Sequence, residues 1–239
     1  MTLRHLVLIL PKCKKPEALH LDFQITPLFY SNILSAGLAF SIAYLMLRSF
    51  RVVRRDYLLG FPIGFSFLAL SYLFLAVSTA FPSVSEVARW SDLFSTTYGF
   101  AFIAGTYFLR RRGAAGPFSR WLFSLAILAV LVIVLVEVVP PFGGLPPYAV
   151  GAQVFLIVNL ALLGYIIFSL NQALKQGPHE VNFLVQTGFI LLAFGQYSFL
   201  LWMLDQGFWS FALANLFRLA GLVALLIEAA TAVTAPYHG

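Results

Sequence analysis

The sequence has few charged residues and almost no cysteine. Only 10% of its 239 residues are charged, whereas soluble globular domains usually carry about 25%. Hydrophobic residues make up 61% of the chain, and this excess requires a solvent other than water. The single cysteine, Cys13, allows neither an internal disulfide bond nor a cysteine metal site. The composition disfavours a soluble enzyme, a nucleic-acid-binding domain, a disordered regulator and a disulfide-stabilised secreted domain, and indicates a protein embedded in lipid.

Side chains that carry most enzymatic chemistry are scarce in the apolar segments. The four histidines lie near the termini or in a loop, at His5, His20, His179 and His238. A bis-histidine haem, a histidine-ligated zinc and a Ser-His pair inside a bundle therefore have no residues to form them. The lysine nearest to an apolar segment, Lys175, lies in a predicted loop, which excludes a retinal Schiff base on the last helix. We expect no enzymatic activity, no metal and no cofactor.

The apolar residues form long continuous runs. A helix needs about 20 apolar residues to cross roughly 30 Å of hydrocarbon. Seven stretches reach that length without the alternation of a barrel strand. They are Pro27–Leu47, Tyr57–Ala80, Ser91–Leu109, Trp121–Val139, Ala149–Leu170, Phe183–Leu204 and Trp209–Val233. The sequence therefore predicts an all-α, polytopic membrane bundle of seven transmembrane helices over residues 27–235, preceded by an N-terminal arm over residues 1–26.

Basic residues are concentrated in alternate loops between these stretches. Arginine and lysine tend to stay on the cytoplasmic side of a membrane. One set of loops holds nine of them, at Arg48, Arg51, Arg54, Arg55, Arg110, Arg111, Arg112, Arg120 and Lys175, and the opposite loops hold only Arg89. This distribution predicts a multi-pass protein of the cell membrane, with its N-terminus outside and its C-terminus in the cytoplasm.

The arm over residues 1–26 conflicts in part with this orientation, because it also carries basic residues that would then lie outside. Its apolar run Leu6–Leu10 is shorter than the core of about 7–15 residues that a signal peptide needs. Two interpretations are open: the arm is extracytoplasmic or lies on the membrane surface, or translation begins further downstream.

Short matches between the two halves predict a three-plus-one-plus-three repeat, with units at residues 27–109 and 149–233. Gly64–Leu70 (GFSFLAL) aligns with Gly188–Phe194 (GFILLAF), and Trp90-Ser91 aligns with Trp209-Ser210. Parallel repeats of this kind occur in transporters that move two bundles around a central site. Chance matches are also expected in a chain so rich in Phe, Leu, Ala and Gly, so both interpretations are open.

Arg218 is the most informative polar residue, because it lies about nine residues into the last apolar stretch. An arginine near the centre of a membrane helix costs about 2.5–3.5 kcal/mol on insertion scales, so it should face the bundle and have a partner. At a rise of 1.5 Å per residue, five other polar groups fall at a similar depth: Asn215, Gln196, Asn159, Tyr98 and Tyr72. The carboxylates Asp92, Glu137 and Asp205 all fall within about one turn of the outer helix ends, and Glu137, in an otherwise apolar stretch, is the expected counter-ion. These groups predict either an outward-facing polar pocket for a ligand or a set of structural bridges between helices.

Two segments, RRDYLLGFPIGFSFLALSY (Arg54–Tyr72) and FRLAGLVALL (Phe217–Leu226), carry a resemblance together with the predicted topology. With these features the chain resembles the seven-helix membrane domains of prokaryotic sensory proteins, over most of Pro27–Val233. It implies a non-enzymatic sensor or receptor-like protein. Such domains continue into a cytoplasmic output domain, whereas this sequence ends about six residues after its last predicted helix. The resemblance therefore implies that a signal passes to a separate partner.

Two other functions are open. The repeat is similar to that of sugar-efflux-type transporters, although the Pro-Gln pair expected in the first helix of each half is absent. A transporter needs a polar path from Asn32 and Gln153 to Glu228, and a hydrophobic plug below Arg218 would argue against it. An accessory subunit of a membrane complex would need only packing faces. We expect the lipid bilayer as a partner, together with a small-molecule ligand or a signalling or complex partner, and no nucleic acid.

Overall fold

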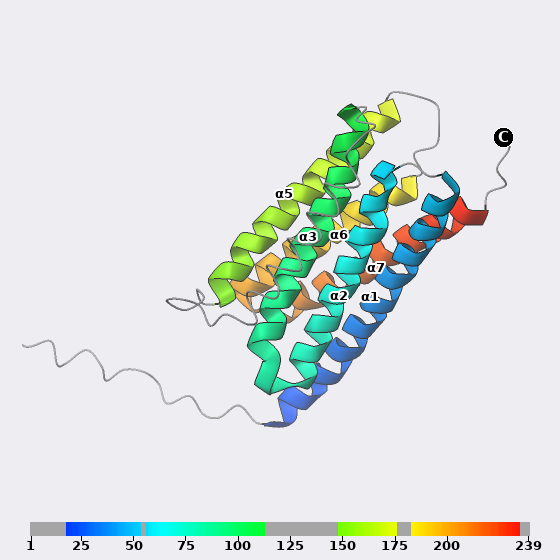
Figure 1. The fold of residues 1–239 in the computed structure, drawn as a ribbon. Helices are drawn as coiled ribbons and strands as arrows, with labels where there is room; N and C mark the ends of the chain where they lie inside the picture. The colour runs from blue at the N-terminus through cyan, green and yellow to red at the C-terminus, as the bar shows by residue number, and fades with distance from the viewer. Residues whose placement is uncertain (1–17, 54–55, 113–147, 176–182, 235–239) are drawn as a thin grey trace, which may run out of the picture.

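The computed structural model describes residues 18–53, 56–112, 148–175 and 183–234, and this part of the chain is all-helical (Figure 1). Its long helices are α1 (Ala18–Val53), α2 (Gly60–Ala80), α3 (Ser85–Arg112), α5 (Tyr148–Lys175), α6 (Phe183–Asp205) and α7 (Phe208–Thr234). Two short 3₁₀ helices, η1 (Asp56–Leu59) and η2 (Pro82–Val84), precede α2 and α3.

Five of the described helices, α1, α2, α5, α6 and α7, are long and apolar enough to cross a membrane. α3 is as long as α5 but more polar, because its first half carries Glu86, Arg89 and Asp92. Large apolar side chains are exposed on the outside of the bundle, including Leu34, Phe168, Phe194, Leu216 and Ile227. Such a surface suits hydrocarbon rather than water. The chain is a multi-pass helical membrane protein.

The described helices match six of the seven predicted stretches, and among the helix starts those of α1 and α3 differ most from the prediction. α1 begins at Ala18 and continues through Pro27, so the end of the predicted arm belongs to this helix. α3 begins at Ser85 instead of Ser91, with the acidic Glu86 in its first turn, where a negative charge favours the helix dipole. The predicted helix at Trp121–Val139 lies outside the described residues.

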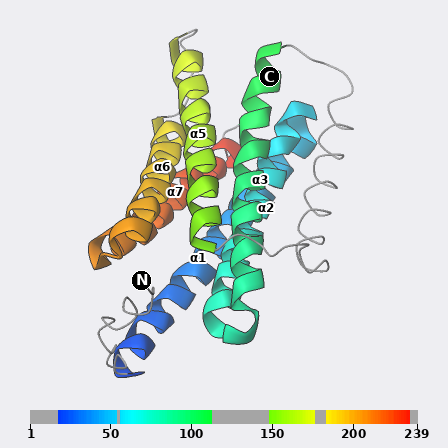
Figure 2. The same cartoon turned by 90° about the vertical axis from the view of Figure 1, so that its left-hand side faces the viewer.

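The described helices form a closed ring. Each packs against the next along the chain, and α7 returns to contact α1. α1, α2 and α3 form one half of the ring, and α5, α6 and α7 form the other. The halves meet at two seams, one between α1 and α7 and one between α3 and α5. Figure 2 shows α3 and α5 side by side.

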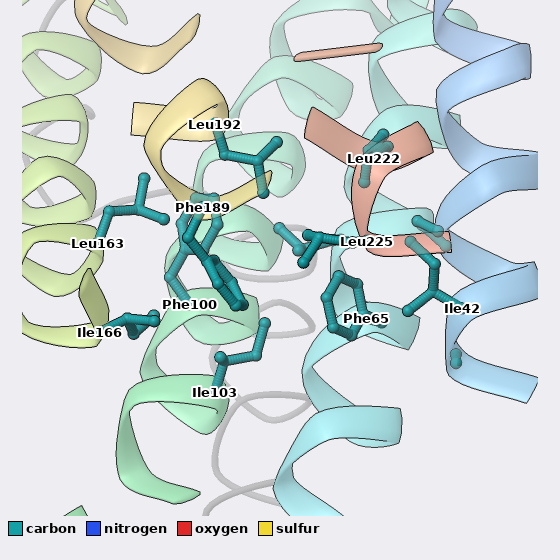
Figure 3. Close-up of a cluster of buried hydrophobic side chains, with 14 of the residues drawn as sticks. Ile42, Phe65, Phe100, Ile103, Leu163, Ile166, Phe189, Leu192, Leu222 and Leu225 are labelled. Carbon is teal, nitrogen blue, oxygen red and sulfur yellow. The ribbon is translucent and has the colours of Figure 1, made fainter. Parts of the chain in front are cut away.

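The centre of the ring is apolar toward the end where α2 and α6 begin. Figure 3 shows large side chains from the six helices pointing toward one another. They include Ile42, Phe65, Phe100, Ile103, Leu163, Ile166, Phe189, Leu192, Leu222 and Leu225, which are almost fully buried. In lipid, this packing stabilises the bundle through van der Waals contact rather than through exclusion of water.

Two glycine pairs bring helix backbones into direct contact. A Cβ atom added to Gly64 on α2 would lie 2.7 Å from the carbonyl oxygen of Gly99 on α3. A Cβ atom added to Gly221 on α7 would lie 2.8 Å from the carbonyl oxygen of Gly188 on α6. Small residues permit such crossings in membrane bundles. The crossings occupy corresponding helices of the two predicted repeat units, and the duplication itself stays a prediction.

We predict that Gly64→Ala destabilises the protein by about 1–3 kcal/mol, because the added methyl group must push two backbones apart. Gly37→Ala on α1 is the matched control, since a Cβ atom there meets no atom within 4 Å. Thermal unfolding in detergent measures both variants. Equal unfolding temperatures for the two variants would contradict the close crossing of α2 and α3.

Candidate functional site

A cavity of about 540 Å³ lies between the described helices. All six long helices contribute to its wall. Its lining includes residues that mark one end of the bundle: Leu28 in the first third of α1, Thr79 near the end of α2, Tyr148 at the start of α5 and Gln206 just after α6. The cavity is therefore at the end of the bundle where α1, α3, α5 and α7 begin. Its volume is in the range of about 300–1,000 Å³ that is typical of small-molecule sites.

Arg218 on α7 lines the cavity and is bound by neutral oxygen atoms. Its Nη2 atom donates to the Oδ1 atoms of Asn32 and Asn215, both at 2.8 Å, and to the Ser31 hydroxyl at 3.2 Å. The guanidinium also lies over the ring of Tyr72, with Cζ 4.9 Å from the ring centroid. These contacts hold the arginine in place without neutralising its charge.

Part of the guanidinium has no partner among the described residues. Nε of Arg218 is buried, and no residue in the described ranges accepts a hydrogen bond from Nε or from Nη1. A buried polar group without a partner costs about 1–3 kcal/mol, and more when it is charged. Arg218 can therefore still donate to an acceptor inside the cavity.

Asp92 on α3 supplies a carboxylate to the same cavity. Its Oδ1 atom accepts hydrogen bonds from the hydroxyl groups of Ser71 on α2 and Thr96 on α3, and these hydroxyls contact each other at 2.6 Å. No described residue donates to Oδ2, and Asp92 forms no ion pair with Arg218 in the described part of the chain.

Other buried polar atoms at the cavity also have no partner among the described residues. They are the Tyr72 hydroxyl, Nδ2 of Asn159 and Oε1 of Gln196, and all three residues line the cavity. Buried polar groups are hydrogen-bonded in most proteins, to protein or to water. These residues therefore supply several polar groups that can bind a polar molecule at the cavity.

An asparagine occupies each of the two seams. Asn32 on α1 accepts from Arg218 on α7, and Asn159 on α5 accepts from Thr97 on α3 at 2.8 Å. Both asparagines are almost fully buried, and Nδ2 of each has no hydrogen-bond partner among the described residues. The two seams are thus joined by the same type of contact, a side-chain donor on one helix and an asparagine oxygen on the other.

At the open end of the cavity, the side chains are larger and partly exposed. Arg89 on α3 lies over the ring of Tyr148 on α5, with Cζ 5.8 Å from the centroid. An aromatic group forms the wall on the side of α6 and α7, where Trp202 is 5.2 Å from Phe199 and 5.4 Å from Phe211 between ring centroids. This wall offers apolar surface beside the charged groups.

The structure brings five of the seven predicted site residues to this one cavity: Arg218, Asn215, Gln196, Asn159 and Tyr72. Tyr98 is not among the lining residues, because it lies on another side of α3, where its ring is 6.2 Å from that of Phe67. Glu137 lies outside the described residues.

The expected position of Asp92 was wrong. The sequence suggested that it lies close to the outer end of its helix, but α3 begins at Ser85, which places Asp92 about two turns inside. Ser31, Asn32, Ser71 and Thr96 were also missed as partners of the two charged groups. Their hydroxyl and amide groups are common in membrane helices, so residue type alone does not distinguish them.

Comparisons with known proteins give no match: no family model, no curated protein and no solved structure matches this chain.

We predict that Asn32→Leu destabilises the protein by about 1–3 kcal/mol, because it removes an oxygen that binds a buried cation. Ser41→Ala on the same helix is the control, since the exposed Ser41 hydroxyl bonds only to the carbonyl of Gly37. Chemical denaturation in detergent gives both values. An unchanged stability for Asn32→Leu would show that Arg218 does not depend on this contact.

Proposed function

We propose that this chain is a non-enzymatic, receptor-like protein of the cell membrane that binds a small polar molecule in the cavity around Arg218. The observation that carries this proposal is that one cavity of about 540 Å³ is lined by several residues, each with a buried polar atom that has no hydrogen-bond partner among the described residues. Ligand binding would alter the contacts at the two seams, and the change would pass to a partner chain.

A purely structural role for Arg218 fits the geometry less well. A structural clamp needs its donors to be used by protein acceptors, whereas Nε of Arg218 is buried without an acceptor among the described residues. A clamp also gives no reason for the Tyr72 hydroxyl and the Gln196 oxygen, which line the same cavity and have no partner in the described part of the chain. A bound ligand, with water around it, would satisfy these groups together.

The apolar centre of the bundle favours a receptor over a transporter. Below Arg218, the next two turns of α7 contribute Leu222 and Leu225 to the core, where Phe65, Phe100 and other large side chains surround them. This layer separates the cavity from the opposite end of the described bundle. A transporter would have to open a path through this layer in another conformation.

The proposed topology has seven helices, with the N-terminus outside and the C-terminus in the cytoplasm. It is supported by the nine basic residues in alternate loops. In that orientation the cavity opens to the outside of the cell, because it lies at the end where α1 begins.

We predict that a membrane-impermeant maleimide labels Cys13 from the outer side of right-side-out vesicles. Cys13 is the only cysteine, so labelling reports one site, and Cys13→Ser serves as the control. Labelling only after the vesicles are permeabilised would reverse the proposed orientation.

We predict that at least one member of a panel of small acids, amines, sugars and amino acids raises the unfolding temperature of the detergent-solubilised protein. A ligand at about 100 times its Kd stabilises a protein by about 2.7 kcal/mol. The stabilisation should be lost in Arg218→Gln and kept in Arg48→Gln, since Arg48 is exposed on α1 and does not line the cavity. An equal response of both variants would reject Arg218 as part of the site.

A further inference from the structure

Besides Arg89 at its open end, the cavity presents a cation and a carboxylate that are bound separately, Arg218 and Asp92. Arg218 is surrounded by the neutral oxygens of Ser31, Asn32 and Asn215, and Asp92 by the hydroxyls of Ser71 and Thr96. Among the described residues they form no ion pair with each other. A buried cation and a buried carboxylate in one cavity would ordinarily be expected to pair, because desolvation of isolated charges is costly.

Each charged group has atoms that form no hydrogen bond with the described residues. Nη1 and Nε of Arg218 and Oδ2 of Asp92 have no partner among the described residues. Both groups are attached to the same part of α2, since Asp92 binds the hydroxyl of Ser71 and Arg218 lies over the ring of Tyr72. The two residues therefore line one cavity from neighbouring positions.

A ligand that carries both charges complements this arrangement. A carboxylate accepts hydrogen bonds from a guanidinium in a planar geometry, and an ammonium group donates to a carboxylate. An anion alone would leave Asp92 without a counter-charge, and a cation alone would leave Arg218 without one. Either ligand would also be repelled by the like charge in the wall.

The rest of the wall indicates the remainder of the ligand. Phe199, Trp202 and Phe211 form an aromatic surface at the cavity, and Leu156 and Met203 extend it with aliphatic surface. Apolar groups of a ligand gain free energy by leaving water for such a surface. The cavity is large enough for a charged head and an apolar side chain.

We propose that the ligand is an apolar α-amino acid, with its carboxylate on Arg218, its ammonium group on Asp92 and its side chain on the aromatic wall. This rests on the proposed function, because it names the ligand class for the same cavity.

The test uses matched probes on the full-length protein in detergent. L-Phenylalanine is compared with 3-phenylpropionate, which lacks the ammonium group, and with phenethylamine, which lacks the carboxylate. L-Leucine is compared in the same way with 4-methylpentanoate and 3-methylbutylamine. We expect at least one of the two amino acids to bind, and each of its truncated analogues to bind about tenfold more weakly or worse, since a hydrogen bond to a charged group contributes that much or more. Calorimetry or thermal shift gives the Kd values.

Two variants test which residue of the protein binds which charged group of the ligand. Asp92→Asn should weaken amino-acid binding about tenfold or more, whereas the carboxylate analogue should bind at least as tightly as before, because the like charge in the wall is gone. Arg218→Gln should weaken amino-acid binding in the same way, and the amine analogue should bind at least as tightly as before. Glu86→Gln is the matched control for Asp92→Asn, because the exposed Glu86 lies on α3 away from the cavity. The probe comparison on the unaltered protein still decides the question if a variant does not fold.

Several outcomes would overturn this proposal. If a carboxylate analogue binds as tightly as its parent amino acid, Asp92 is not an ammonium site. If neither amino acid binds, the ligand class is wrong. In both cases a ligand from the broader panel that depends on Arg218 would leave the proposed function standing, so the two failures can be distinguished.

Discussion

The position of the Arg218 guanidinium is the constraint on which the rest of the site depends. A charged group inside a lipid-embedded bundle must be solvated by the protein. Here the solvating atoms come from Ser31 and Asn32 on α1 and from Asn215 on α7, so the arginine fixes how these helices meet. The aromatic face of Tyr72 adds α2 to the same arrangement. One side chain therefore sets the relative position of three helices at one end of the ring.

The bundle combines this polar end with an apolar one. Because hydrocarbon surrounds the protein, burial of leucine and phenylalanine does not drive helix association as it does in water. Close contact does, and the glycine pairs of α2–α3 and α6–α7 provide it. The polar end can consequently carry a cavity with unpartnered groups, since the apolar packing and the glycine crossings stabilise the helices elsewhere.

Much of this arrangement could be predicted from the sequence. The remaining parts could not be predicted, and there is a physical reason for each failure. Continuous apolar runs predicted helix positions such as the start of α6 at Phe183. The thickness of the hydrocarbon layer sets the length of a membrane helix, and a run of apolar residues of that length is visible in the sequence. Depth along each helix correctly grouped Gln196 and Asn159 with Arg218. Depth does not give the direction of a side chain, so Tyr98 was grouped with them although it faces elsewhere. The depth of Asp92 inside its helix was underestimated, because the polar residues at the start of α3 resemble a loop in hydropathy.

The two seams have a mechanical consequence. The glycine crossings bind α2 to α3 and α6 to α7 through backbone contact over a short distance, so each pair should move as a rigid body. The seams, by contrast, are bridged at the cavity by side-chain contacts to Asn32 and Asn159, which can break and re-form without deforming a helix. Asp92 belongs to the half of the ring that contains α3, and Arg218 to the half that contains α7. A molecule bound to both Asp92 and Arg218 would connect the two halves of the ring, and its length would set the angle between them.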